Sequence, residues 1–136
     1  MILVDTSVII HAAGAAHPNK APSAELLARI GRGEIEATVD AVVLQELLEH
    51  YREIGQWAVG RRVVELTRQL FANILPLSAA VTDRAARLLD ADPRLVPRCA
   101  IHAAMVMTAG LEGVCSYDSG FDRIMGLARQ EPASVP

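Results

Sequence analysis

Short apolar segments alternate with longer amphipathic stretches along this chain of 136 residues. Residues 1–4, 36–39, 73–77 and 113–117 are predicted as strands, because each is short, rich in apolar side chains and bounded by turn or capping residues. The stretches between them carry apolar residues at helical spacing. Strands that alternate with helices form mostly parallel sheets with helices on both faces. The sequence therefore predicts an α/β fold.

The length of the chain fits one domain and is too short for two full hydrophobic cores. We assign residues 1–130 to this domain and predict that residues 131–136, which include two prolines, form a frayed tail. No apolar run approaches the roughly 18 residues that a membrane span needs, and the first residues lack the basic leader of a signal peptide. We therefore expect a cytoplasmic protein whose two cysteines, Cys99 and Cys115, are free thiols.

The net charge of −3 does not attract nucleic acid by bulk electrostatics. If this chain binds RNA, the contacts must come from a local arginine surface or from a bound metal ion. Arg98 and Arg123 are candidates for such contacts with an RNA backbone, and the alternative for each is a solvated surface charge.

Two aspartates directly follow predicted strands. Asp5 comes after residues 1–4 and Asp118 after residues 113–117. In parallel sheets the ligand crevice lies at the carboxyl ends of the strands, so both carboxylates point to the same crevice if both strands are central. Carboxylate oxygens are the ligands that Mg²⁺ prefers. The alternative is that both aspartates only cap turns.

Glu46 and Asp122 are two further acidic candidates. Glu46 is surrounded by apolar residues (VVLQELL), so it either faces a pocket or lies solvated at the edge of the apolar stripe of its helix. Asp122 follows Phe121 in a turn, where it either caps a short helix or supports a metal from its outer shell.

Four segments in order give the chain a family resemblance: residues 2–7 (ILVDTS), 44–47 (LQEL), 98–104 (RCAIHAA) and 116–122 (SYDSGFD). Together they resemble the PIN-domain family, and most of all the VapC-type toxins of prokaryotic toxin–antitoxin pairs. The resemblance implies a three-layer fold with a twisted, mostly parallel five-stranded sheet. It also implies an endoribonuclease that depends on Mg²⁺ or Mn²⁺, forms a homodimer and is blocked by a small antitoxin protein.

The resemblance also implies roles for individual residues. Asp5, Glu46 and Asp118 would be the catalytic carboxylates that bind the metal ion, which activates water for phosphodiester hydrolysis. Ser7 would supply a hydroxyl that supports this site, and Asp122 would be an accessory acid near the metal.

Cys99 departs from the family pattern, which has an aspartate at this position. A thiol is a poor ligand for a hard cation such as Mg²⁺, although a cysteine near a helix N-terminus can ionise more easily. Three interpretations stay open: a nuclease with reduced activity, an inactive PIN-like module that binds RNA or a protein partner, and an altered metal site that uses Cys99 together with His102. We favour a packed, hydrogen-bonded role for His102.

A hydrolase of the phosphatase type, with Asp5 as nucleophile, is a separate possibility. That chemistry requires a second acid two residues later, and the chain has Ser7 there. The sequence therefore favours the metal-dependent nuclease.

Overall fold

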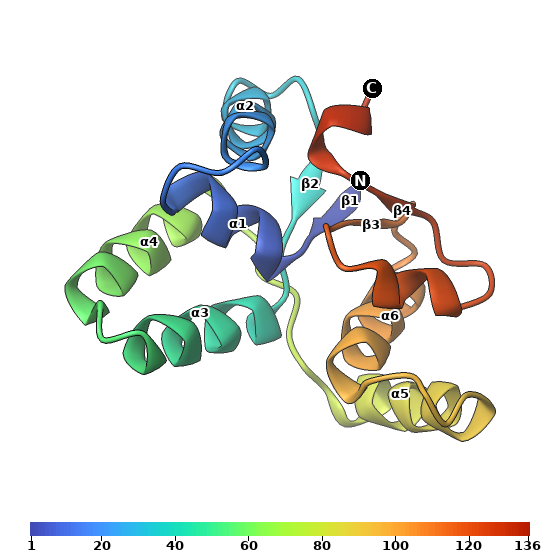
Figure 1. Cartoon of the computed structure of the whole chain (residues 1–136). Helices are drawn as coiled ribbons and strands as arrows, with labels where there is room; N and C mark the ends of the chain where they lie inside the picture. The colour runs from blue at the N-terminus through green and yellow to red at the C-terminus, as the bar shows by residue number, and fades with distance from the viewer.

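The computed structural model describes residues 1–136 and contains a four-stranded parallel sheet (Figure 1). Its strands are, in chain order, β1 (Ile2–Val4), β2 (Ala37–Thr38), β3 (Val114–Cys115) and β4 (Arg129–Gln130). They lie side by side in the order β2-β1-β3-β4, and every neighbouring pair is parallel. β1 and β3 are therefore the two central strands, which is the condition for Asp5 and Asp118 to share one crevice.

The α/β class and the parallel sheet are confirmed, but the expectation of five strands is wrong. Residues 73–77 form no strand, because Leu75 makes only an isolated parallel bridge with Asp40. The amide of Leu75 donates to the carbonyl of Val39 at 3.1 Å, and its carbonyl accepts from the amide of Ala41 at 2.8 Å. The next residue, Pro76, has no amide hydrogen and cannot extend the ladder.

The end of the chain contains regular structure where the sequence predicts a frayed tail. Within residues 131–136, a 3₁₀ helix, η2 (Pro132–Ser134), follows β4. The guanidinium of Arg29 donates to the carbonyls of Val135 at 3.0 Å and of Pro136 at 2.6 Å, and the side chain of Val135 is buried. Contacts with distant residues thus hold this segment, and such contacts leave no local sequence signal.

Six α-helices and a further 3₁₀ helix complete the structure: α1 (Thr6–Ala13), α2 (Lys20–Gly31), α3 (Ala41–Glu53), α4 (Trp57–Leu70), α5 (Ala79–Ala91), α6 (Pro97–Ala109) and η1 (Ser119–Arg123). Two helices begin with side-chain caps: Asp40 accepts from the amide of Val43 at 2.9 Å, and Ser78 accepts from that of Val81 at 3.3 Å. None of the helices has the length and apolar character that crossing a membrane requires.

Alternation along the central strands divides the helices into two layers. Ile2 and Val4 of β1 pack into one core with α1, α2, α3 and α4, whereas Leu3 points to the other core, with α5 and α6. β3 alternates in the same way, with Val114 facing α6 and Cys115 facing the opposite core. Figure 1 shows the two groups of helices on either side of the strands. The sheet therefore forms the middle layer of three.

Candidate metal centre

Asp5, Glu46 and Asp118 converge at the carboxyl ends of the central strands. Asp5 directly follows β1, and Asp118 lies three residues beyond β3, at the start of η1. Glu46 points to them from α3, which begins just after β2. The side chain of Asp5 is completely buried, that of Glu46 is mostly buried, and that of Asp118 is 38% exposed. The three acids thus form a cluster that opens to solvent on the side of Asp118.

The guanidinium of Arg98, in the first turn of α6, binds all three of these carboxylates. Its Nη2 donates to Oδ1 of Asp5 at 2.6 Å, its Nη1 to Oδ2 of Asp118 at 2.7 Å, and its Nε to Oε2 of Glu46 at 3.1 Å. One planar group contacts all three acids, so residues separated by more than 110 positions in the chain lie within reach of a single side chain. Arg98 thus links the three acids that the sequence analysis singles out.

Two serine hydroxyls fix the carboxylate of Asp5. Ser7 donates to Oδ2 of Asp5 at 3.1 Å, and Ser116 donates to the same oxygen at 2.5 Å. Ser116 also accepts from the backbone amide of Asp118 at 2.9 Å, so it links the segments that follow β1 and β3. The buried carboxylate is therefore held in one orientation, with Oδ1 turned toward Arg98.

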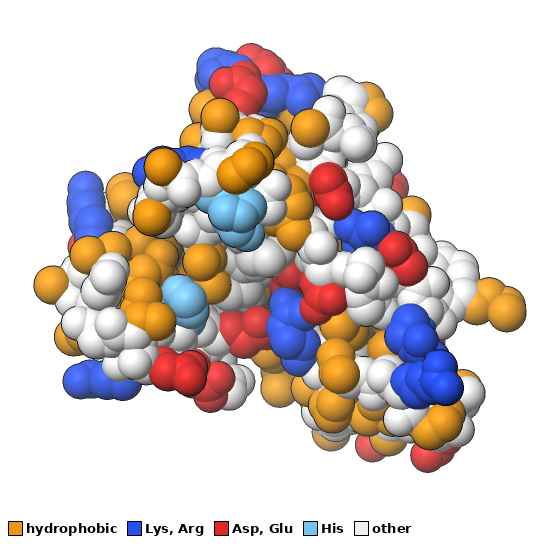
Figure 2. Space-filling model, in the orientation of Figure 1, with side chains coloured by type: hydrophobic (Ala, Val, Ile, Leu, Met, Phe, Trp, Pro, Cys, Tyr) orange, Lys and Arg blue, Asp and Glu red, His pale blue; other side chains and the backbone are white.

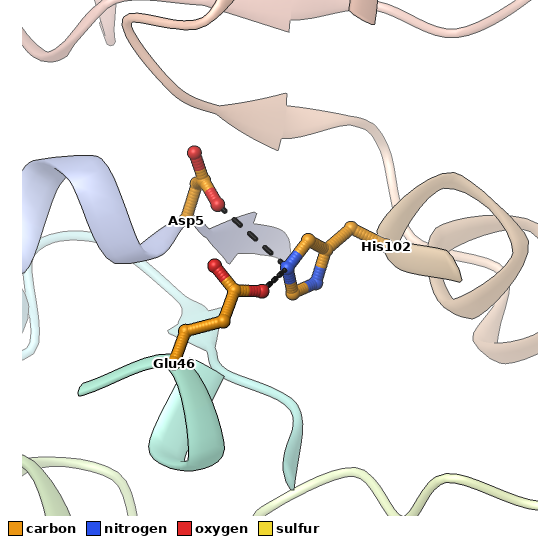
Figure 3. Close-up of side chains that lie close together, drawn as sticks. All are labelled: Asp5, Glu46 and His102. Atoms are coloured by element: carbon orange, nitrogen blue, oxygen red, sulfur yellow. Dashed lines mark hydrogen bonds and ion pairs between the residues drawn. The ribbon is translucent and has the colours of Figure 1, made fainter. Parts of the chain in front are cut away.

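Glu46 is held by a buried histidine, His102 of α6 (Figure 3). Nε2 of His102 lies 2.6 Å from Oε1 of Glu46 and 3.8 Å from Oδ1 of Asp5, and its Nδ1 lies 2.6 Å from Oδ2 of Asp40. Burial lowers the pKa of His102, but hydrogen bonds with Asp40 and Glu46 outweigh it and raise the pKa to about 10. At neutral pH the imidazole is thus a cation that donates from both ring nitrogens.

The same contacts keep Glu46 ionised. Burial raises the pKa of its carboxyl group, but the hydrogen bond and charge of His102, together with those of Arg98, bring the pKa below its usual value. Glu46 therefore offers a carboxylate at neutral pH. As the sequence analysis favours, His102 is a hydrogen-bonded core residue, because both of its nitrogens are already engaged.

Asp118 and Cys99 lie next to each other at the open side of the cluster. The amide of Gly120 donates to Oδ1 of Asp118 at 2.8 Å, and a Cβ atom on Gly120 would lie 2.9 Å from that oxygen and 3.3 Å from Sγ of Cys99. A side chain at position 120 would therefore push against both groups. The thiol of Cys99 is directed at Oδ2 of Asp118, at 3.5 Å.

Cys99 does not contribute a negative charge to this cluster. Burial and the charge of Asp118 raise the pKa of its thiol to about 12, although the charge of Arg98 acts in the opposite direction. The possibility of a thiolate, suggested by the position of Cys99 near a helix N-terminus, is thus not supported. Because the pKa values of Cys99 and His102 are both raised, each would have to lose a proton before it could bind a metal ion, which disfavours an altered metal site built from these two residues.

Two of the other candidates lie outside the cluster. Asp122 forms a bidentate ion pair with Arg129, at 2.9 and 3.0 Å, and more than half of its side chain is exposed. The structure therefore does not bring Asp122 to the metal site as an accessory acid, because Arg129 holds it on the outer side of η1. Arg123 likewise pairs with Asp92, at 2.8 and 3.1 Å, on the exposed surface.

A polar pocket of about 470 Å³ opens beside the cluster, between α1, α3 and α6. Its lining includes Glu46, Arg98 and Thr6. Figure 2 shows acidic and basic side chains close together at the centre of this face. The hydroxyl of Thr6 is the only buried side-chain nitrogen or oxygen in the protein without a hydrogen-bond partner. Such an atom beside a cluster of carboxylates fits a site that receives a further polar group.

The chemistry of these donors suits a divalent cation. Three carboxylates supply hard oxygen ligands, the type and number that Mg²⁺ and Mn²⁺ use in proteins. Ligand atoms of Asp5, Glu46 and His102 all lie within 4.8 Å of one another, which is close enough for a shared ion. Because His102 already bonds Asp40 and Glu46, the carboxylates of Asp5 and Glu46 are the better donors of this group. Asp118 lies outside the group and is linked to it through Arg98.

Sequence reasoning missed three contributors to this site: Asp40, Ser116 and Thr6. Asp40 binds His102 and directly follows the predicted strand 36–39, so the rule that selects Asp5 and Asp118 could have found it. Ser116 lies within the predicted strand 113–117, so the same rule passes over it. Nothing in the sequence indicates that the hydroxyl of Thr6 is left without a partner.

The fold and the site define a parallel α/β protein with an acidic cluster at the carboxyl edge of its sheet, and comparisons with known proteins agree with this class. The model of the PIN domain family matches residues 2–127. Ribonuclease VapC13 of Mycobacterium tuberculosis is 29% identical over 129 residues, covering 95% of this chain and 98% of that protein. Ribonuclease VapC7 of the same organism is 32% identical over 126 residues, covering 89% and 84%. The chain therefore belongs to the PIN-domain family, and these relatives are VapC ribonucleases.

Solved structures show the same fold. FitAcB from Neisseria gonorrhoeae superposes with a TM-score of 0.76 at 20% identity, covering 99% of this chain and 100% of that chain. VapBC2 from Rickettsia felis, solved with a DNA fragment from its promoter, superposes with a TM-score of 0.73 at 17% identity, covering 96% and 98%. At these identities the likeness concerns the fold.

Proposed function

We propose that this protein is a metal-dependent endoribonuclease, the toxin of a toxin–antitoxin pair, whose activity is reduced by Cys99. The observation that carries the proposal is that Asp5, Glu46 and Asp118 surround one guanidinium, that of Arg98, at the carboxyl edge of a PIN-domain sheet. The names of the relatives, which are VapC ribonucleases, support RNA as the substrate.

In this proposal the three carboxylates hold Mg²⁺ or Mn²⁺ and are the catalytic residues. When bound, such a cation supplies Lewis acidity to the phosphodiester and activates water for attack. Ser7 and Ser116 keep Asp5 oriented, and His102 keeps Glu46 ionised and aimed at the cluster. Residues outside the set of ligands thus determine its geometry.

Arginines near the site would hold the RNA backbone. Arg98 borders the pocket beside the cluster, and Arg123 lies on η1, close in sequence to Asp118. Both are engaged by carboxylates, so each would exchange an acidic partner for a phosphate when RNA binds.

The proposed protein partner is a small antitoxin, and an apolar groove supports this. The groove, of about 300 Å³, lies between α1, α2 and α4, and nine of its ten lining residues are hydrophobic. Leu66 of α4 lines this groove and is 46% exposed. An exposed apolar groove of this kind suits an apolar segment of another chain. FitAcB and VapBC2, which share the fold, are a further reason to propose such a pairing.

Homodimer formation and a cytoplasmic location complete the proposal. Both rest on the resemblance to VapC-type toxins, which implies a dimeric protein that acts on RNA inside the cell. The competing function is an inactive PIN-like module that binds RNA or a protein partner. The observation in its favour is Cys99, whose neutral thiol replaces one acid of the family pattern.

The decisive experiment is cleavage of a structured RNA with Mg²⁺ or Mn²⁺, compared with the same reaction in EDTA and with Asp5→Asn. We expect metal-dependent cleavage that Asp5→Asn lowers by about 100-fold or more, because losing even an outer partner of a metal ligand costs roughly 10- to 100-fold. Cleavage that persists in Asp5→Asn would show that the assigned site is wrong. Saturable RNA binding without cleavage would favour the inactive module.

A further inference from the structure

Arg98 differs from every other arginine of the protein in the partners that its side chain binds. It contacts three separate carboxylates with three different nitrogens, and one of these carboxylates, that of Asp5, is completely buried. In the remaining arginine ion pairs the acid is always at least 24% exposed, as in the pairs of Arg32 with Glu25 and Glu34. The acids bound by Arg98 are the same three that form the proposed metal site.

A guanidinium and a divalent cation cannot share these carboxylates without cost. Both are positive, and two positive charges a few ångströms apart repel strongly where water is excluded. The oxygens Oδ1 of Asp5, Oε2 of Glu46 and Oδ2 of Asp118 already accept charge-assisted hydrogen bonds from Arg98. A metal ion that binds these oxygens must therefore break those bonds.

We propose that Arg98 is a built-in counter-ion that competes with the divalent metal for Asp5, Glu46 and Asp118, so that metal binding requires its displacement. This inference rests on the proposed function, since it concerns the same metal site. Arg98 would then raise the concentration of divalent metal ion at which the site becomes occupied.

The surroundings of Arg98 allow this displacement. Its side chain is 35% exposed and borders the polar pocket of about 470 Å³ beside the cluster. Apart from the three acids, its guanidinium contacts only Sγ of Cys99, at 3.8 Å, and the ring of Phe121, whose centroid is 5.8 Å away. Both contacts are weak, so moving the guanidinium into the pocket loses little besides the carboxylate bonds.

The same contacts explain how the cluster is stable before metal binds. Three carboxylates beside one another repel, and burying a charge without a partner is costly. Arg98 supplies a positive charge to this group and contacts all three acids. Removing its charge should thus weaken the metal-free fold and strengthen metal binding. A residue with a purely structural role would produce only the first effect.

The test measures Mn²⁺ binding to the EDTA-treated full chain in the absence of RNA, by titration calorimetry and by the electron paramagnetic resonance signal of free Mn²⁺. Arg98→Gln removes the charge, and Arg98→Lys keeps it on a compact ammonium group that lacks the planar, forked donors of the guanidinium. Arg32→Gln is the matched control, because Arg32 binds Glu25 and Glu34 and none of the site acids. Any Mn²⁺ binding that remains in Asp5→Asn occurs outside the proposed site.

We expect Arg98→Gln to bind Mn²⁺ about tenfold more tightly than the wild type, in the range typical of coupled binding equilibria. Arg98→Lys should show a smaller gain and Arg32→Gln none. In EDTA, Arg98→Gln should melt at a lower temperature than the wild type, and saturating Mn²⁺ should raise its melting temperature by more.

Unchanged or weaker Mn²⁺ binding by Arg98→Gln would overturn the inference and leave the proposed metal site intact. If Arg98→Gln does not fold, wild-type affinity in Arg98→Lys would overturn it in the same way. A different outcome, no saturable Mn²⁺ binding by the wild type or by any variant, would contradict the proposed function itself and the inference with it.

Discussion

Two kinds of contact between acids and arginines occur on neighbouring parts of this protein. On the inner side of η1, Arg98 binds Asp5, Glu46 and Asp118, which are buried or partly buried. On its outer side, Arg129 forms a bidentate pair with Asp122, which is more than half exposed. The chemical groups are the same, and the ion-pair distances are similar.

The difference lies in what surrounds the pairs. Water solvates Asp122 whether or not Arg129 is present, so this carboxylate gains little from the pair. Arg129, whose side chain is 16% exposed, also donates to the carbonyl of Ser116. Asp5 has no access to water, so its charge needs partners, and the serines, Arg98 and any bound metal are the groups that serve. A buried carboxylate such as that of Asp5 therefore requires positively charged or hydrogen-bonding partners, whereas an exposed carboxylate does not.

The largest expected effect is on RNA cleavage, and it comes from adding a carboxylate to the buried cluster. Cys99→Asp places a carboxylate next to Asp118, whose Oδ2 lies 3.5 Å from the present thiol. We expect RNA cleavage with Mg²⁺ to rise by about tenfold or more, because a hard oxygen ligand replaces a neutral sulfur. Initial cleavage rates over a Mg²⁺ titration measure this change.

Cys99→Ser is the matched control, since it removes the sulfur without adding a charge, and it should leave cleavage near the wild-type rate. Equal rates for Cys99→Asp and the wild type would contradict the claim that Cys99 reduces activity.

Removing the charge of one aspartate should lower the stability of the protein at a buried position and leave it unchanged at an exposed one. We expect this effect to be smaller. Asp40→Asn keeps an acceptor for the amide of Val43 but loses the ionic bond to His102, in a place that is completely buried. We expect it to lower the free energy of unfolding by about 2–3 kcal/mol. Urea unfolding of the metal-free protein measures this.

Asp122→Asn provides the comparison, because it breaks the exposed pair with Arg129, and its unfolding midpoint should equal that of the wild type within experimental error. Equal losses in Asp40→Asn and Asp122→Asn would mean that burial does not distinguish the two kinds of acid.

Local sequence signals were sufficient for much of the fold and for the acids themselves. The caps Asp40 and Ser78 mark helix starts, and Gly110 ends α6 with a left-handed backbone, φ 66°. Asp5 and Asp118 could be selected because each follows an apolar strand, and the carboxyl ends of parallel strands share one edge. Glu46 was singled out by its apolar neighbours and by the family resemblance.

The remaining features depend on contacts between distant segments. Whether Arg98 reaches RNA or the acids is decided by its side-chain torsions and by partners 20 to 93 residues away. The order in residues 131–136 likewise depends on Arg29, and the missing fifth strand depends on Pro76. The pattern of a single segment contains no information about such partners.

A crystal grown or soaked with Mn²⁺, with data collected to locate the ion by its anomalous scattering, tests the central claim most directly. The account predicts an Mn²⁺ peak bonded to carboxylate oxygens of Asp5, Glu46 and Asp118, with the guanidinium of Arg98 moved away from them. An ion bound elsewhere, or a guanidinium still on all three acids at saturating Mn²⁺, would contradict it.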